Sequence, residues 1–364
     1  MRVGIDAGQV LSGQGGVAAY SRELVKALAA PELNDEIVLY DLEGRMPRRA
    51  LFEQALGPLP ARVVVGCGTD EELESLDVFH APAFAMPPPG APRHLFTLHD
   101  LTVISHPECH TIGNRVRTLT SLAEALSRGA TLLAVSEATR REAQRLLAIP
   151  PAAMEVLPPF VNAIFSPAGS AQDDLEVAHQ LGIRRPCALV VGSLEPRKNL
   201  SRLLDAWSQL PAAMQSAHQL VVVGGEGWKE LGVRRQLRAM VRDGSVVRAG
   251  FVAESSLAAQ YRQTRAFVFP SIAEGFGLPV AEAIACGAPV VTSNRSSLPE
   301  VAGQAAILVD PENTEDLAVA IQSLLEDREL RHGLREAGLE RAQCHASAVL
   351  LPKLRAIYQR AASA

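Results

Sequence analysis

Short apolar segments alternate with amphipathic segments along most of the chain, and this alternation starts again after residue 185. Residues 3–6 form the first apolar segment, and a glycine-containing loop and an amphipathic segment over 18–28 follow it. A strand that leads into a helix and then into another strand is typical of a parallel sheet with helices on both faces. Two such runs predict an α/β protein with two Rossmann-like, doubly wound domains.

The same pattern predicts the remaining elements. Two helices are expected in the first half, over 119–127 and 137–147, and the segment after 313 is expected to be helical to the end. The expected strands are 37–40, 62–65, 78–80, 95–98 and 131–135 in the first half, and 188–191, 220–223, 246–249, 266–269, 289–292 and 306–309 in the second. Proline and small polar residues over 157–171 mark the linker.

Length and composition limit the classes of function. A chain of 364 residues with 48% apolar residues exceeds the ~250–300 residues at which single cores stop growing. Its net charge of −5 argues against nucleic acid as a partner, since binding to phosphate backbones needs a basic face. Five scattered cysteines without a C-x-x-C pair indicate a reducing compartment. We expect a cytoplasmic protein without a signal peptide or membrane span, with at most peripheral contact at the inner face of the membrane.

The segment from Glu274 to Glu282, with the sequence EGFGLPVAE, is a glycine-punctuated turn that leads into a helix. Gly275 and Gly277 allow the backbone to approach a ligand closely, and a helix start favours a phosphate. Carboxylates at both ends would repel a phosphate but accept hydrogen bonds from pairs of hydroxyl groups. The combination predicts a nucleotide sugar as ligand, although an ordinary strand-to-helix turn would also explain the glycines.

Two glutamates separated by seven residues, with these glycines and the following AIACGAPVV over 283–291, resemble the donor site of GT-B glycosyltransferases, specifically the retaining family 4. The resemblance extends from near residue 1 to about residue 330 and is densest between 188 and 310. It implies an acceptor domain over 1–160, a nucleotide-sugar domain over 161–340 and a C-terminal helix in 341–364 that returns to the first domain. The two domains would face each other across a cleft.

The resemblance assigns roles to the residues of this turn. Glu282 would accept hydrogen bonds from both ribose hydroxyls, and Glu274 would bind hydroxyls of the donor sugar. Backbone N–H groups near Phe276, Gly277 and Leu278 would contact that sugar or the phosphates. In this family the acceptor attacks on the face that the nucleotide leaves, so no side-chain base is required.

The loop GSLEPRKN over 192–199 resembles the family's diphosphate-binding loop. Asn199 is expected to cap the next helix, which would place Arg197 and Lys198 at the carboxyl edge of the sheet. Two cations there would stabilise the departing diphosphate and replace a metal ion. Many members carry arginine after the first glycine, where this chain has Ser193, and we expect Arg197 to supply that charge. The alternative is a solvated Arg-Lys pair beside a turn.

In the first half, the sequence GQGGVA over 13–18 contains a weak dinucleotide fingerprint that does not directly follow its strand. The resemblance instead implies that Gly15 and Gly16 lie over the donor phosphates, while a flexible loop is the alternative. His99 follows the strand over 95–98, and family members often place a histidine here against the transferred sugar. A structural histidine is the alternative to that catalytic role.

The sequence gives few indications of which base the nucleotide carries. Phe251 and Val252 match the segment whose backbone meets the base in this family. The glycine turn over 224–227 either approaches the nucleotide or only turns the chain. Five histidines between 80 and 110, with Cys109, allow a zinc hypothesis, but their spacing fits no usual zinc site. We therefore expect neither a metal nor a cofactor.

The sequence most resembles bacterial mannosyltransferases or related hexosyltransferases of polysaccharide assembly. We expect GDP-mannose as donor, with a UDP-hexose as second choice, and a saccharide, either free or lipid-linked, as acceptor. Three alternatives belong to other classes: an NAD-dependent dehydrogenase, a sugar-nucleotide epimerase and a binding subunit without catalytic activity. The dehydrogenase would need a glycine fingerprint directly after a strand, which neither half contains.

Overall fold

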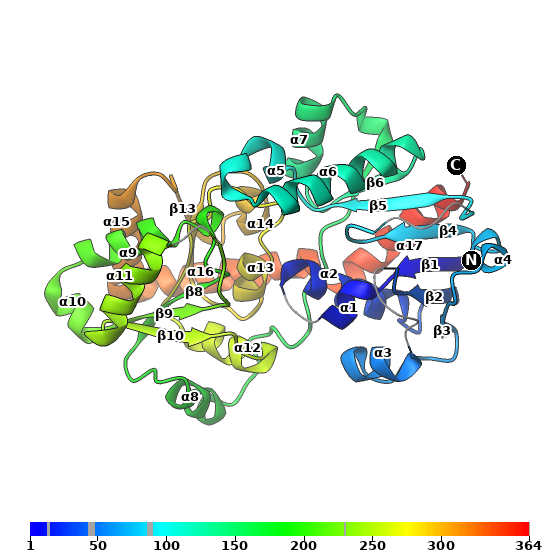
Figure 1. Cartoon of the computed structure of the whole chain (residues 1–364). Coiled ribbons are helices and arrows are strands. Elements are labelled where there is room, and N and C mark those ends of the chain that lie inside the picture. The colour runs from blue at the N-terminus through cyan, green and yellow to red at the C-terminus, as the bar shows by residue number, and fades with distance from the viewer. Residues whose placement is uncertain (13–14, 43–47, 86–89, 229–230, 364) are drawn as a thin grey trace. The chain divides into compact units, whose positions relative to one another are not determined.

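The computed structural model describes residues 1–12, 15–42, 48–85, 90–228 and 231–363. The chain folds into two compact units (Figure 1). Unit 1 contains Met1–Phe160 and His345–Ala364, and unit 2 contains Val161–Cys344.

The described residues of unit 1 contain a seven-stranded parallel sheet with the order β3-β2-β1-β4-β5-β6-β7. The order reverses between β1 and β4, the arrangement of a doubly wound sheet. Its strands are β1 (Arg2–Asp6), β2 (Glu36–Tyr40), β3 (Val63–Val65), β4 (Val78–Ala81), β5 (His94–Leu98), β6 (Thr131–Ala134) and β7 (Met154–Val156).

Helices of unit 1 connect and cover these strands. They are α1 (Gly8–Ser12), α2 (Gly16–Leu28), α3 (Arg49–Leu56), α4 (Asp70–Glu74), α5 (Thr102–Ser105), α6 (Ile112–Ser127), α7 (Glu137–Leu147) and α17 (Ser347–Ser363). The C-terminal helix α17 packs on β4, where the Tyr358 hydroxyl is hydrogen-bonded to His80 Nδ1 (Figure 1). The last helix of the chain thus contributes to the core of unit 1.

The described part of unit 2 repeats this design in a six-stranded parallel sheet with the order β10-β9-β8-β11-β12-β13. The order reverses between β8 and β11. The strands are β8 (Cys187–Val191), β9 (Gln219–Val223), β10 (Val246–Gly250), β11 (Ala266–Phe269), β12 (Val290–Ser293) and β13 (Ala306–Val309). The helices are α8 (Ala171–Gln180), α9 (Leu200–Gln209), α10 (Ala212–Ala217), α11 (Leu231–Arg242), α12 (Glu254–Gln263), α13 (Leu278–Ala285), α14 (Leu298–Ala302), α15 (Thr314–Glu326) and α16 (Arg328–Ala342).

The predicted α/β class and the two doubly wound sheets are confirmed. Strands β11 and β13 and helix α7 match their predicted ranges to the residue. Strand β7, which has three residues, was not predicted. The expected loop before the first long helix instead contains the short helix α1. Among the described helices, none is long and apolar enough to cross a bilayer.

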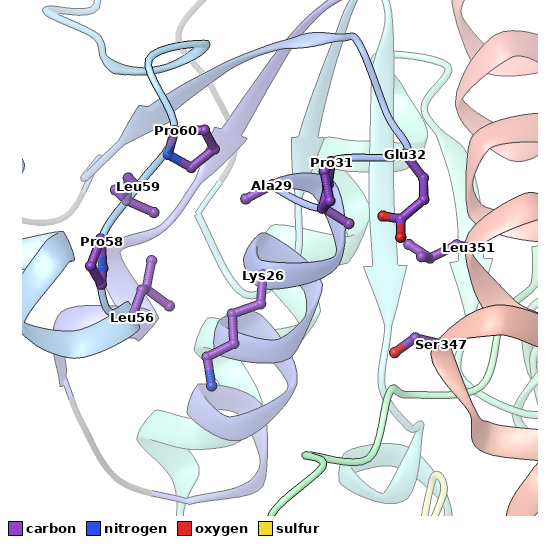
Figure 2. Close-up of a pocket in the computed structure, with 11 residues that line it drawn as sticks. Lys26, Ala29, Pro31, Glu32, Leu56, Pro58, Leu59, Pro60, Ser347 and Leu351 are labelled. Carbon is purple, nitrogen blue, oxygen red and sulfur yellow. The ribbon is translucent and has the colours of Figure 1, made fainter.

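A pocket of about 440 Å³ lies in unit 1, between the end of α2, the segment 56–60 and the start of α17 (Figure 2). Pro31 follows α2, and Leu59 and Pro60 lead into β3, so the pocket is at the amino ends of the strands. Doubly wound sheets bind ligands at the carboxyl ends of their strands. This pocket is therefore at the opposite end of the strands from the edge where such folds bind ligands.

Candidate functional site

The turn that begins at Glu274 follows β11 and is held by two neighbouring serines. The backbone N–H of Glu274 donates to Ser296 Oγ at 2.9 Å. The Ser297 hydroxyl is hydrogen-bonded to the carbonyl oxygens of Glu274 and Phe276 at 3.0 and 2.8 Å. Phe276 is 6% exposed, so its ring anchors the turn in the core. The conformation of this turn is therefore fixed by the protein itself.

Gly277 is required by the backbone at the start of α13. Its φ of +99° is in the left-handed region, and a Cβ atom here would lie 2.6 Å from Leu298 Cδ2. Helix α13 begins at Leu278, so Pro279 occupies its second position. A proline is tolerated in the first turn of a helix, whose N–H groups have no partner within the helix.

Glu274 is the acceptor for both cations of the loop over 192–199. Its two carboxylate oxygens lie 2.6 Å from Arg197 Nη1 and 2.6 Å from Lys198 Nζ. All three side chains are largely buried, with exposed fractions of 9%, 12% and 15%. Burial would raise the pKa of the Glu274 carboxyl, but the charges of Arg197 and Lys198 hold it well below its usual range. The carboxylate is ionised at neutral pH.

The two cations differ in their other contacts. Arg197 also donates to the Ala273 carbonyl at 2.7 Å and to Glu195 at 2.9 Å, so its guanidinium is held by three acceptors. Lys198 Nζ lies 4.9 Å from the centroid of the Phe269 ring, and its hydrogen bond to Glu274 uses one of three N–H donors. Arg197 therefore has the geometry of a positioning residue, and Lys198 retains donors for a ligand.

Glu282 is on α13 and is hydrogen-bonded to Tyr261 of α12. The Tyr261 hydroxyl donates to Glu282 Oε2 at 3.1 Å, and the tyrosine is completely buried. Burial raises the pKa of the Glu282 carboxyl to about 7, although the hydrogen bond from Tyr261 acts in the opposite direction. The two glutamates of the motif thus differ sharply in charge state near neutral pH.

Three loops at the carboxyl ends of β8, β9 and β10 are connected by their backbones. The N–H of Gly224 donates to the Gly250 carbonyl at 2.7 Å, and the N–H of Leu194 donates to the Gly225 carbonyl at 3.2 Å. A Cβ atom on Gly224 would lie 2.0 Å from the Gly192 carbonyl oxygen. The close approach of two loops, and not a ligand, thus explains the glycine at 224.

Asn199 occupies the position before α9, but its side chain does not cap the helix. Its φ of +58° is left-handed, and its amide donates to the carbonyls of Pro270 and Pro311 at 3.1 and 2.6 Å. The predicted cap is therefore wrong. Asn199 instead connects the loop over 192–199 to the ends of β11 and β13.

Phe251 and Val252 follow the edge strand β10. The ring of Phe251 is 64% exposed, and Val252 is partly exposed. Gly250 before them has a φ of +69°, which turns the chain at the end of the strand. The ring of Phe251 is therefore accessible beside the three loops that follow β8, β9 and β10. The predicted contact with a base stays a prediction.

His99 and the glycine pair are in unit 1. His99 Nε2 donates to the Pro82 carbonyl at 2.8 Å, and the ring of Tyr20 meets the imidazole edge-on at 4.9 Å. Burial lowers the pKa of His99, so the imidazole is neutral and its Nδ1 is an acceptor. Gly15 has a φ of +88° directly before α2, which begins at Gly16; Gly13 and Gln14 lie outside the described residues.

Among the described residues, no group of three or more His, Cys, Asp or Glu side chains could hold a metal ion. In the histidine-rich segment, His80 is in the core, where burial lowers its pKa to about 3, and its Nε2 is hydrogen-bonded to Thr97. His110 is hydrogen-bonded to Thr102 at 2.9 Å. These two histidines serve the structure of unit 1.

The sequence model described as "Glycosyl transferases group 1" matches residues 172–341. The O-antigen chain mannosyltransferase B of Escherichia coli is 33% identical over 268 residues, which are 73% of this chain and 70% of that protein. The chain belongs to the group 1 glycosyltransferases. It is thus an enzyme that uses a nucleotide-sugar donor, and this identity replaces the dehydrogenase and epimerase hypotheses.

Other comparisons agree with this glycosyltransferase assignment. A GDP-mannose-dependent alpha-(1-6)-phosphatidylinositol monomannoside mannosyltransferase of Mycobacterium tuberculosis is 30% identical over 205 residues, which are 52% of this chain and 51% of that enzyme. The solved structure of Anabaena HepE in complex with UDP and glucose superposes with a TM-score of 0.77 at 18% identity, covering 99% of this chain and all of HepE. At that identity the superposition confirms the GT-B fold alone.

Sequence reasoning missed several residues that shape the site of this glycosyltransferase. Tyr261 contacts Glu282, which is 21 positions further along the chain, and no local pattern marks such a contact. Ser297 lies in an ordinary-looking turn, although its hydroxyl holds two carbonyls of the motif. Glu195, 5% exposed, looked like a loop residue, but it fixes the guanidinium of Arg197. All three act by positioning residues that the sequence did identify.

Proposed function

We propose that this chain is a retaining mannosyltransferase that moves mannose from GDP-mannose to a saccharide acceptor. The observation that carries this proposal is the 33% identity with a mannosyltransferase of O-antigen chains over most of both proteins. The name of the mycobacterial relative also specifies GDP-mannose. A UDP-hexose is the second candidate donor, since HepE, a structural neighbour, was solved with UDP and glucose.

The site geometry supports a division of roles in unit 2. Glu282 accepts hydrogen bonds from the two ribose hydroxyls, while Phe251 and Val252 lie beside the base. Glu274 accepts hydrogen bonds from hydroxyls of the sugar, and backbone N–H groups of 275–278 contact the sugar or the phosphates. The fixed turn and the left-handed Gly277 support this arrangement, because they hold the backbone in one conformation before a ligand arrives.

Lys198 stabilises the leaving diphosphate, and Arg197 positions Glu274 and the loop that contains it. Glu195, Arg197, Lys198 and Glu274 together carry two positive and two negative charges. A diphosphate therefore does not meet two unpaired cations. Arg197 was expected to supply the charge that Ser193 lacks, but its guanidinium is already paired with Glu195 and Glu274. The two remaining donors of Lys198 support its role toward the phosphates. In this scheme the reaction requires no metal ion.

Transfer with retention follows from attack on the face that the nucleotide leaves. The bond between the anomeric carbon and the phosphate oxygen breaks, and the acceptor oxygen bonds to the same carbon. The acceptor proton passes to the leaving phosphate oxygen, so atoms and charges balance without a side-chain base. In unit 1 the neutral imidazole of His99 would accept a hydrogen bond from a sugar hydroxyl at Nδ1, and Gly15 and Gly16 would lie over the phosphates.

We further propose that the acceptor is lipid-linked and that the enzyme works at the cytoplasmic face of the membrane. Helix α6 supports this proposal. Four of its apolar side chains are exposed, and they follow one another at intervals of four, three and seven positions: Ile112 (79%), Val116 (58%), Leu119 (37%) and Leu126 (41%). These intervals place them on one face of a helix. Arg115 and Arg117 lie between them, which suits an anionic lipid surface.

Product analysis tests the enzymatic proposal. Purified enzyme is incubated with labelled GDP-mannose, UDP-glucose or ADP-glucose, each with and without a mannose-containing acceptor, and the products are separated and sequenced by mass spectrometry and NMR. We expect an α-linked mannoside only with GDP-mannose and acceptor together. A β-linked product would overturn the proposed retention. If UDP-glucose were the only one of the three donors to be turned over, it would replace GDP-mannose as the proposed donor. Donor binding without any product would contradict the proposed donor and acceptor.

Flotation with vesicles tests the membrane contact separately. The wild-type enzyme is expected to float with phosphatidylglycerol vesicles, and the Val116→Ser/Leu119→Ser variant is expected to stay in the soluble fraction. Val319→Ser/Leu175→Ser, the same two substitutions at exposed positions of α15 and α8, is the matched control. Equal flotation of all three proteins would show that α6 is not the contact.

A further inference from the structure

A second cationic site lies in unit 2, on the open edge of its sheet beside the edge strand β10. A pocket of about 560 Å³ is lined by Leu237, Val241 and four arginines, three from α11 and one from β10: Arg235, Arg238, Arg242 and Arg248. Figure 1 shows α11 on the outside of this unit, next to α9. The donor-site residues Glu274 and Glu282 do not line this pocket.

Three of the four arginines of α11 have no salt bridge to an acidic side chain among the described residues. Arg235, Arg238 and Arg242 are exposed at intervals of three and four positions, and the described structure contains no ion pair for any of them. Like charges at these intervals destabilise a helix. Glu226 pairs with Arg234, the fourth arginine of α11, and with Arg248. Among the described residues, three guanidinium groups of this cluster thus have no salt bridge, in a chain whose net charge is −5.

An open sheet edge explains only part of this cluster. Charged residues on an edge strand prevent it from pairing with other strands, and Arg248 on β10 is in the right place for that task. The three arginines of α11 are on a helix and have no such function. Arginine presents a rigid fork of donors that fits phosphate oxygens in pairs, whereas lysine would serve solubility equally well.

We propose that this arginine pocket binds a phosphate-bearing anion that carries two or more phosphate charges. The span from Arg235 to Arg242 corresponds to about 10 Å of helix, which lets separate guanidinium groups reach separate phosphates. A pocket of this volume also holds more than a single phosphate. The ligand is either a soluble polyphosphate compound or a cluster of anionic lipid headgroups, and the two sources share this chemistry.

Binding in this pocket would also affect the loops that follow β8 and β9 at the carboxyl edge of the sheet. Arg248 and Arg234 hold Glu226, which is part of the glycine turn over 224–227. An anion that draws Arg248 away would loosen this turn, whose Gly225 carbonyl accepts a hydrogen bond from Leu194 in the loop that contains Lys198. The pocket is thus structurally connected to the donor site without sharing its residues.

The experiment compares two variants with equal charge loss. In the first, Arg235, Arg238 and Arg242 are replaced by glutamine; in the control, the exposed Arg141, Arg145 and Arg328 are replaced by glutamine. Tripolyphosphate binding is measured by calorimetry, and cosedimentation is measured with phosphatidylglycerol and phosphatidylcholine vesicles. Any binding at Lys198 is common to all three proteins, so it does not affect the comparison.

We expect the α11 variant to lose about tenfold or more in affinity for tripolyphosphate or for phosphatidylglycerol vesicles, while the control retains wild-type affinity. A loss confined to tripolyphosphate identifies a soluble ligand, and a loss confined to vesicles identifies a lipid headgroup. Equal affinity in all three proteins, or an equal loss in both variants, overturns the proposal. Because the assay uses no donor sugar, its outcome does not depend on the proposed transfer reaction.

Discussion

Lys198 donates a 2.6 Å hydrogen bond to Glu274 across a separation of 76 residues in the sequence. This contact links the loop after β8 to the turn after β11, the two strands between which the order of the sheet reverses. Ligands of doubly wound folds bind at such a switch point. The position of the ion pair therefore supports its assignment to the donor site on grounds that are independent of the family motif.

Replacing Lys198 by alanine should lower kcat more than it raises KM, because the charge on the diphosphate grows as the glycosidic bond breaks. Losing one preorganised electrostatic partner typically costs about 10²–10³-fold in rate. Arg197→Ala should in addition lower the melting temperature, because it leaves Glu195 and Glu274 buried with one partner fewer. Steady-state kinetics and thermal unfolding of both variants separate these effects.

The same variants test whether the reaction needs a metal ion. Wild-type enzyme treated with EDTA should keep its activity, and Lys198→Ala should be impaired with or without the chelator. An EDTA-sensitive wild type together with active Lys198→Ala would overturn the metal-free scheme.

Glu274→Gln should reduce turnover without weakening the binding of free GDP. The partner of Glu274 is the sugar, and removing its negative charge leaves the neighbouring Lys198 more attractive to phosphates. GDP affinity, measured by calorimetry, is therefore expected to be equal to or higher than that of the wild type. If GDP and GDP-mannose lose affinity equally, the roles of Glu274 and Glu282 have been interchanged.

The sequence was sufficient for the fold and for the residues with a strong local signature. Strand and helix periodicity located both sheets, since buried parallel strands are continuous apolar runs such as Ala266–Phe269. The motif residues Glu274 and Glu282 were identified by their resemblance to the donor site of the family. The partners of these residues were not, because Tyr261 and Glu195 meet them only through the tertiary fold. For Asn199 the local signature was misleading. Asparagine is a favourable cap residue, but the side-chain amide here donates to the carbonyls of Pro270 and Pro311, which are distant in the sequence.

Glu282→Ala should weaken the binding of the nucleotide and of the nucleotide sugar to a similar extent. Hydrogen bonds to a charged group contribute about 1.5–3 kcal/mol, so the expected loss is about ten- to a hundred-fold in affinity. Calorimetry with GDP and GDP-mannose measures both. Unchanged affinity in a folded variant would remove Glu282 from the site.

Donor affinity should depend on pH through Glu282, because its carboxyl has a pKa of about 7 and only the ionised form accepts from both ribose hydroxyls. Below pH 7 the group becomes protonated, and affinity should fall by about tenfold per pH unit. In Tyr261→Phe the hydrogen bond that favours the carboxylate is lost, so the midpoint of this dependence should move to higher pH. The phenylalanine ring keeps the packing against Phe165 and Phe267.

Titration of GDP binding between pH 5.5 and 8.5 provides the measurement, with Glu282→Gln as the control. This variant carries no titratable group at position 282, so its affinity should be low and independent of pH. A wild-type profile that is equally flat, or a Tyr261→Phe midpoint that moves to lower pH, would contradict the assignment.

Two adjacent glycines, Gly224 and Gly225, allow a test of whether the contact between the loops after β8 and β9 supports the donor site. Gly224 has a φ of +141° and no space for a Cβ atom, which would lie 2.0 Å from the Gly192 carbonyl oxygen, whereas Gly225 has no atom within 4 Å of its Cβ position. Because the obstacle at Gly224 is backbone, Gly224→Ala must displace the loop over 192–199. Overpacking and strain of this kind typically cost about 1–3 kcal/mol each. We expect Gly224→Ala to lower both the melting temperature and the transfer rate, and Gly225→Ala to leave both unchanged. Equal behaviour of the two variants would show that the contact between the loops does not support the donor site.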